Sequence, residues 1–247
     1  MGPEMIENIL FATIRTGTPL LLVALGAMIS ERSGVLNLGQ EGMILIGAVC
    51  AFIGAHTTGS IIVGVASGLV SGALFSLIFA VVALSLISNQ IATGLALTIL
   101  GTGLSAFIGV NYVGLSLDGL SGLEIPLLHH LPIVGKALFS QDPMVYLSLG
   151  LFAVIYYTMT YTRLGLVIRA VGENPEVAHR MGYRVLLVRY ATVVFGGAMA
   201  GLGGAYLSLV YTPMWTEGMS AGRGWIALAL VVFASWRTER VLIGAWL

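Results

Sequence analysis

The stretch Thr162–Arg189 reads TRLGLVIRAVGENPEVAHRMGYRVLLVR and is a long polar, arginine-rich segment in a chain that is otherwise mostly apolar. Five of the eleven basic residues lie in it: Arg163, Arg169, Arg180, Arg184 and Arg189. Apolar runs long enough to cross a membrane flank it on both sides. Because short loops rich in Lys and Arg are retained in the cytoplasm, we place residues 162–189 on the cytoplasmic face of a membrane protein.

A short helix is predicted inside this loop. Asn174 is a good N-cap residue, Pro175 suits the first helical position, and Glu176 falls in the first turn. Apolar residues then recur at helical spacing among the arginines: Val177, Met181, Val185 and Val188. We therefore expect a helix that lies along the membrane face with one polar side, a shape suited to docking a soluble partner.

The overall composition indicates lipid as the main solvent. The chain has 247 residues, of which 57% are hydrophobic and 9% charged, and its mean hydropathy is +0.98. A soluble domain carries about 25% charged residues. Net charge is zero, so we expect no nucleic-acid partner. The 33 glycines predict close packing between membrane helices.

A span needs about 20 residues, and eight apolar runs are candidate membrane helices, the seventh shorter than this and the eighth only begun. They are Ile9–Met28, Val35–Ile53, Ile61–Ile87, Ile91–Val110, Met144–Tyr161, Tyr190–Tyr211, Trp225–Trp236 and Val241–Leu247. The fold class expected is all-α and polytopic, with about eight spans in a single transmembrane domain over residues 1–247. The sequence stops inside the eighth run, so we expect a C-terminally truncated chain.

Alternation of the spans gives a topology. With residues 162–189 inside, residues 30–34, 88–90 and 237–240 are also cytoplasmic, and the N-terminus and residues 111–143 and 212–224 are external. Eight of the eleven basic residues then fall in the inside loops, as the positive-inside rule requires. The adjacent His129 and His130 of the external segment have no third ligand nearby, so we predict no metal site.

Glu41 is the clearest ionisable residue at membrane depth, where such groups are functional candidates. Asn37 and Glu41 are four residues apart, on one face if the segment is helical, and Gly34, Gly39 and Gly42 allow a broken helix. One interpretation is a polar face that lines a translocation path or a helix joint. The other is structural: Glu41 pairs with Arg32 or caps a neighbouring helix.

Further path candidates are Gln40 and the polar residues before the fourth span. Asn89, Gln90 and Thr93 begin a helix with polar residues about one turn apart, which could face water. Hydrogen bonding between packed spans explains the same pattern. The candidates for the translocation path are therefore Asn37, Gln40, Glu41, Asn89, Gln90 and Thr93.

Two common catalytic motifs are absent from the sequence. It has neither a phosphate-binding Gly-x-x-x-x-Gly-Lys-Ser/Thr loop nor a His-Glu-x-x-His motif. We therefore expect no enzymatic activity and no cofactor bound by this chain. Any ATP and Mg²⁺ would reside in a partner subunit.

Four stretches together resemble the permease subunits of bacterial ABC importers for nucleosides and simple sugars, within the wider group of ribose and branched-chain amino acid permeases. They are Ser30–Met43 (SERSGVLNLGQEGM), Gln90–Leu97 (QIATGLAL), Gly172–Glu176 (GENPE, with Gly182 downstream) and Met219–Ala229 (MSAGRGWIALA). They occur in family order and cover the chain from about residue 12 to its end. Gln40 departs from the first pattern, where an apolar residue or another small variation is expected.

The resemblance implies an all-helical permease that pairs with a second permease subunit around a central path. Two ABC ATPase subunits dock below it, and an extracytoplasmic binding protein or lipoprotein delivers the solute. The cytoplasmic motif implies that the ATPase contact is made by Gly172, Glu173, Asn174, Pro175, Glu176 and Arg180, with a helix from Pro175 to about Met181. The location implied is the bacterial cell membrane.

Two alternatives stay open. The same permease role fits branched-chain amino acids or a simple sugar, because the binding protein selects much of the cargo. A transporter driven by an ion gradient, with Glu41 as the coupling group, belongs to a different class and predicts inverted repeats.

Overall fold

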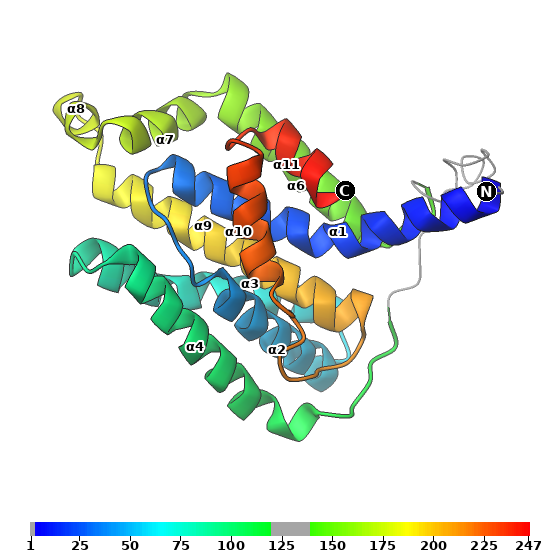
Figure 1. Ribbon diagram of the computed structural model, residues 1–247. Helices are drawn as coiled ribbons and strands as arrows, with labels where there is room; N and C mark the ends of the chain where they lie inside the picture. Colours follow the sequence, from blue (N-terminus) through cyan, green and yellow to red (C-terminus); the bar gives the residue numbers. More distant parts are fainter. Residues whose placement is uncertain (1–2, 120–138) are drawn as a thin grey trace.

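The computed structural model describes residues 3–119 and 139–247, which form a bundle of helices (Figure 1). The helices are α1 (Pro3–Arg32), α2 (Gln40–Thr58), α3 (Ile61–Ala80), α4 (Gln90–Gly109), α6 (Pro143–Tyr161), α7 (Arg163–Glu173), α8 (Pro175–Arg180), α9 (Val185–Tyr206), α10 (Arg223–Phe233) and α11 (Thr238–Ala245). Short π-helical segments extend α3 over Val81–Ser85 and α9 over Leu207–Tyr211. The predicted all-α, polytopic fold is confirmed.

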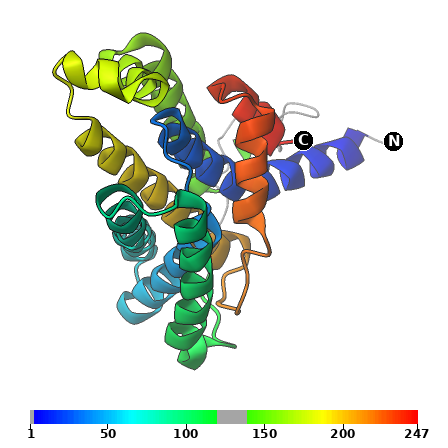
Figure 2. The same cartoon turned by 60° about the vertical axis from the view of Figure 1, so that its left-hand side comes forward.

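Six helices of the described part are long and apolar enough to cross a membrane: α1, α2, α3, α4, α6 and α9. About eight were expected. The seventh and eighth apolar runs form α10 and α11, which have 11 and 8 residues. Both are too short for a full span of about 20 residues. The two apolar runs themselves have only 12 and 7 residues, and the loop 212–222 leads directly into α10 (Figure 2).

Helix α9 lies at the centre and packs against α1, α2 and α3. Glycines make this possible, because they let two backbones touch. A Cβ built on Gly72 of α3 would lie 2.7 Å from the Cα of Gly201 of α9. Helices α2 and α4 also touch through glycines, since a Cβ on Gly101 would lie 2.6 Å from the Cα of Gly42. The close packing predicted from the glycine content is confirmed.

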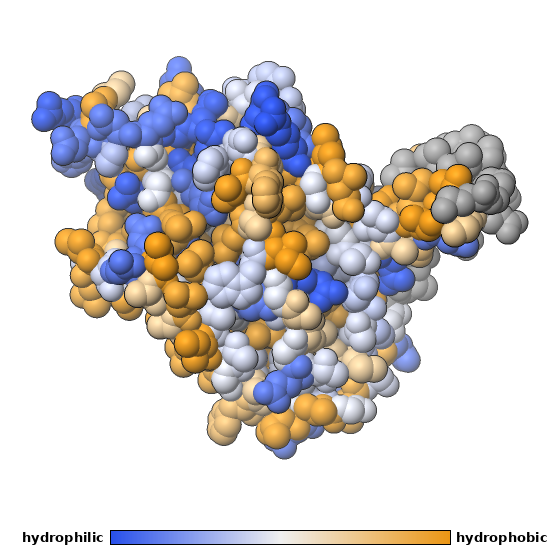
Figure 3. Space-filling view, viewed as in Figure 1, coloured by the Kyte–Doolittle hydropathy of each residue, from blue (hydrophilic) through white to orange (hydrophobic). Residues whose placement is uncertain are grey.

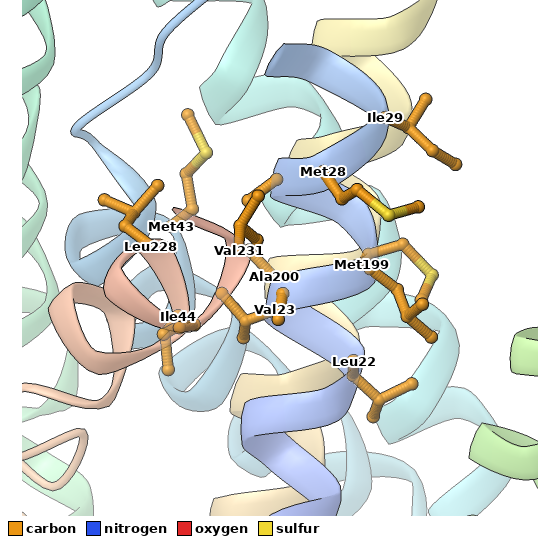
Figure 4. Packing of buried hydrophobic residues seen from close by; sticks show 14 of the residues in the cluster. Leu22, Val23, Met28, Ile29, Met43, Ile44, Met199, Ala200, Leu228 and Val231 are labelled. Atoms are coloured by element: carbon orange, nitrogen blue, oxygen red, sulfur yellow. The ribbon is translucent and has the colours of Figure 1, made fainter. Parts of the chain in front are cut away.

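The apolar core brings together α1, α2, α9 and α10 with parts of α3, α4, α6 and α11, and Figure 4 shows part of it. It contains Leu22, Val23 and Met28 of α1, Met43 and Ile44 of α2, Met199 and Ala200 of α9, and Leu228 and Val231 of α10. Helix α10 therefore buries one face against the bundle. By contrast, α4 exposes large apolar side chains such as Ile99 (74%) and Phe107 (79%), as expected for a face that meets lipid or another membrane subunit.

The loops predicted to share one side of the membrane lie at one end of the molecule. Gln90 lines a pocket with His179 and Arg184, and a second pocket brings Arg32 close to Arg237. At the other end, residues 113–117 lie beside residues 213–215. The rest of the predicted external segment, including His129 and His130, lies largely outside the described residues.

The second span begins later than predicted. The apolar run starts at Val35, but the helix starts at Gln40. Gly34 has a φ of +82°, and the Asn37 side chain accepts a hydrogen bond from the Gly39 amide (2.8 Å), which holds the chain in a turn. Asn37 is therefore not helical, and the expectation that it shares a helical face with Glu41 was wrong.

Candidate functional site

Helices α7 and α8 project from the end of the bundle at which the arginine-rich loop lies (Figure 1). Thr162 caps α7, since its hydroxyl accepts a hydrogen bond from the Gly165 amide. Asn174 then caps α8 by accepting from the Val177 amide at 3.1 Å, with Pro175 at the first helical position. The predicted cap and the start of the helix are confirmed, but α8 ends at Arg180, and Val185 and Val188 belong to α9 instead. The preceding helix α7 was not predicted separately. We call Arg163–Met181, which includes the C-cap residue of α8, the α7–α8 projection.

The tip of this projection is exposed and mixed in character. Glu173, Asn174, Glu176 and Arg180 are exposed, and Pro175 is half-buried. Apolar side chains stand among them, with Val177 49% and Met181 70% exposed. Hydrophilic residues gather over this part of the surface (Figure 3). A protruding helix with a polar rim and apolar points is suited to binding a protein partner.

The base of the projection rests on the segment that joins α1 to α2. We call residues 31–41 the connector: the last turn of α1, the non-helical residues 33–39 and the first residues of α2. A Cβ on Gly172 would collide with the Arg32 carbonyl and lie 3.1 Å from the Gly34 amide. From α9, Arg189 donates to the Ser33 carbonyl (3.2 Å). No side chain separates the predicted coupling motif from the connector at Gly172.

Glu41 lies at the other end of the connector and is 8% exposed. Its carboxylate accepts hydrogen bonds from the Ser220 hydroxyl (2.6 Å) and from the amides of Gly222 (2.7 Å) and Gly224 (2.6 Å). The two amides belong to the N-terminus of α10. A buried carboxylate at a helix N-terminus satisfies free amide groups and meets the positive end of the helix dipole. We call this cluster the Glu41 joint.

The Glu41 joint matches one arrangement that the sequence left open, the cap on a neighbouring helix. The other structural alternative was a pair between Glu41 and Arg32. In the structure the Arg32 guanidinium instead donates to the Trp236 carbonyl, from Nη2 at 2.9 Å and from Nε at 3.2 Å. Gly224 permits the close approach, because a Cβ there would lie 2.5 Å from the Glu41 amide nitrogen.

The remaining path candidates surround the connector and the start of α4. Asn37 and Gln40 are buried. Gln90 accepts from the Leu36 amide at 2.8 Å, which ties α4 to the connector. Asn89 caps α4, and the Thr93 hydroxyl donates to the Ser88 hydroxyl at 3.3 Å. The structure thus brings all six candidates into one neighbourhood, and their contact with a passing solute stays a prediction.

Comparison with known proteins identifies the family. Residues 9–247 match the family model for the permease component of branched-chain amino acid transport systems. The chain belongs to this family. The permease is 46% identical over 244 residues to TsgC13 of Haloferax volcanii, whose name assigns it provisionally to a glucose ABC transporter. That match covers 97% of this chain and 74% of the relative.

Two relatives bear nucleoside names. The permease is 34% identical over 248 residues to NupQ, a guanosine ABC transporter permease protein of Bacillus subtilis, covering 94% of this chain and 77% of the relative. It is 32% identical over 247 residues to NupC, a nucleoside ABC transporter permease protein of Lactococcus lactis, covering 93% and 76%. The predicted role as the permease subunit of an ABC importer is confirmed, and the protein is a multi-pass protein of the cell membrane.

One polar cluster of the permease was missed from the sequence. Arg15 of α1 lies 3.6 Å from Asp142 at the N-cap of α6, and Asp142 also accepts from the Tyr206 hydroxyl of α9 at 3.2 Å. Arg15 lies in the first predicted span and Asp142 at the end of the predicted external segment 111–143, and neither was among the predicted site residues. A charged residue within a span requires a partner, so the search for one was the signal that could have found this pair.

Proposed function

We propose that the permease conducts a small neutral solute rich in hydroxyl groups, a nucleoside or a simple sugar, and is driven by a separate ABC ATPase that docks on the α7–α8 projection. The observation that carries the coupling role is the α7–α8 projection. Its motif residues are exposed at the tip, and Gly172 at its base touches the connector. ATP and Mg²⁺ are held by the ATPase, and this chain has no catalytic role.

The tip of the projection supplies the contact. Glu173, Asn174, Glu176 and Arg180 offer charge and hydrogen bonds, and Val177 and Met181 offer apolar area. The cap by Asn174 and the fixed φ of Pro175 hold α8 rigid before binding, which lowers the entropy lost on docking. The ATPase is thus expected to grip a preformed helix rather than a flexible loop.

Two further partners follow from the permease role. A second permease subunit completes the central path and covers part of the apolar surface that α3 and α4 expose. An extracytoplasmic binding protein or lipoprotein delivers the solute at the opposite end, where residues 113–117 and 213–215 meet. Family membership supports these kinds of partner in general terms.

The cargo class rests on the named relatives. One name refers to glucose and two to guanosine or nucleosides, and all these solutes present several hydroxyl groups. Branched-chain amino acids are the second candidate, because the family model is named for them. Uptake of radiolabelled guanosine, glucose and leucine by cells that express the complete system distinguishes these cases. Uptake of leucine alone would overturn the cargo proposal.

Co-purification tests the coupling role. The permease is expressed with candidate ABC ATPases, solubilised in mild detergent and pulled down, beside a Glu173→Ala/Asn174→Ala/Pro175→Leu variant. We expect one ATPase to bind the parent and to be lost from the variant. Glu217→Ala is the control, because it removes an exposed charge from the external loop 212–222. Equal binding by parent and variant would reject the projection as the docking site.

A further inference from the structure

Helix α10 is bound to the connector at both of its ends. Its N-terminus is held by Glu41 through three hydrogen bonds. Past its C-terminus, the Trp236 carbonyl accepts from Arg32, and the Trp236 indole N–H donates to Glu31 at 2.6 Å. The connector, residues 31–41, thus makes hydrogen bonds at both ends of α10. Their partners lie about 180 to 205 residues further along the chain.

The turn after α10 is shaped to make this grip. Ser235 and Trp236 both have positive φ values, 52° and 55°, a conformation that costs free energy for residues other than glycine. The turn directs the Trp236 carbonyl toward Arg32 and its indole toward Glu31. Three side chains of the connector therefore make directed hydrogen bonds to α10 or to the turn after it: Glu41 at the start of α10, and Glu31 and Arg32 at Trp236.

The sides of α10 are held differently. Ala227, Leu228 and Val231 are buried against the bundle through apolar contacts, as Figure 4 shows for Leu228 and Val231. Such contacts have no directional preference, so they resist separation more than a small sliding or tilting motion. The outer face of α10 remains open, with Phe233 85% exposed. The polar contacts at the ends therefore determine where α10 lies relative to the connector.

The connector is also the segment against which the α7–α8 projection is packed. Because Gly172 touches the Arg32 carbonyl without a side chain between them, the last turn of α7 cannot approach the bundle unless the connector gives way. Arg32 itself is the residue that donates to the Trp236 carbonyl in the turn after α10. One uninterrupted series of contacts runs from the predicted ATPase site through the connector to both ends of α10.

We infer that the connector transmits movement from the docked ATPase to α10, which shifts as a unit during transport, and that Glu31, Arg32 and Glu41 are the positioning residues that carry it. The inference rests on the proposed docking of an ATPase on the α7–α8 projection. It assigns the moving element, which that proposal leaves open. It also gives Glu41 a mechanical role that requires no contact with the solute.

The test follows the environment of α10 in the assembled complex. A spin label is placed on the exposed face of α10 by Ala229→Cys in a Cys50→Ala background. The permease is purified with its ATPase, and the electron paramagnetic resonance spectrum of the label is recorded with and without ATP plus vanadate. We expect a nucleotide-dependent change in the parent. In Arg32→Gln/Trp236→Phe, which removes the C-terminal grip, we expect that change to fall at least twofold, while ATPase binding is retained.

Two matched variants separate transmission from general damage. Trp246→Phe also removes an indole N–H, but one whose nitrogen has no hydrogen-bond partner among the described residues, so it should behave as the parent. Arg32→Lys keeps a charged donor beside the Trp236 carbonyl and should retain most of the spectral change. Ser220→Ala weakens the N-terminal grip alone and should reduce the change less than the double variant does.

The outcomes separate the two proposals. If no ATPase co-purifies with the parent, the proposed function fails and this inference fails with it. If the ATPase binds but the label reports the same spectrum with and without nucleotide, or if the double variant keeps the full change, the inference alone is overturned. A loss of the change in Trp246→Phe as great as in the double variant would also overturn it, because the effect would not depend on the grip.

Discussion

Helices α9 and α10 both bury a face in the core of the permease, but they are held there by different forces. Helix α9 is packed by glycines, with Gly197 and Gly201 against Gly72 and neighbouring backbone of α3. The start of α10 donates hydrogen bonds to Glu41, and the turn after α10 accepts them from Arg32. Backbone contact along a helix prevents sliding, whereas polar contacts at the two ends let a helix move with the segment that holds them. We therefore regard α9 as the fixed frame and α10 as the movable element.

Gly201→Ala should have the largest effect, because it tests the frame. The added methyl group would collide with the Gly68 carbonyl and lie 3.1 Å from the Cα of Gly72, and backbone atoms cannot move aside as a flexible side chain would. We expect a loss of stability on the order of 3 kcal/mol. Thermal unfolding of the detergent-solubilised protein measures it. An unchanged midpoint would show that α9 and α3 can separate without cost.

Glu41→Gln tests the N-terminal grip on α10 and should rank second. A carboxylate accepts from all three donors, but the amide presents an NH₂ group toward one of them and leaves a buried donor without a partner. We expect a loss of about 2 kcal/mol. The same unfolding assay measures it, with the exposed Glu217→Gln as control. Equal behaviour of the two variants would contradict the joint.

Ser220→Ala should have a smaller effect of the same kind. It removes one hydrogen bond of 2.6 Å and leaves the two backbone amides bound to Glu41. We expect a loss of about 1 kcal/mol. A double-mutant cycle with Glu41→Gln measures the coupling between the two side chains. Additive effects of the two substitutions would mean that this hydrogen bond contributes nothing to the joint.

Gly103→Ala is the counterpart of Gly201→Ala: it also replaces a helical glycine, but it should raise stability instead of lowering it. Gly103 is exposed on α4, and a Cβ there meets nothing within 4 Å. Alanine favours the helix over glycine, so stability should rise by about 0.5 kcal/mol. If Gly103→Ala and Gly201→Ala both destabilised the protein equally, helix packing by glycine would not explain the difference between them.

Much of the fold could be predicted from the sequence because the deciding signals are local. Low charge and long apolar runs predicted membrane helices, and the glycine content predicted close packing. The cap and first turn of α8 followed from the order Asn174-Pro175-Glu176, since capping depends on neighbours within one turn. The grouping at one end of the loops that were predicted to be cytoplasmic followed from the distribution of arginine. The number of full spans did not follow, because the seventh and eighth apolar runs, of 12 and 7 residues, were counted as spans although they are shorter than the about 20 residues that a span needs.

The sequence by itself thus determined a polytopic permease with a capped helix in a basic loop. Only the tertiary structure decided what its charged residues contact. Glu41 accepts a hydrogen bond from Ser220, which lies 179 positions further along the sequence. Arg15 of α1 pairs with Asp142 at the start of α6. A residue type and its depth in the membrane predict that a partner must exist, because an unpaired charge there costs too much free energy. Which partner it is depends on how the helices pack, and that is set by the sum of many glycine and apolar contacts distant in sequence.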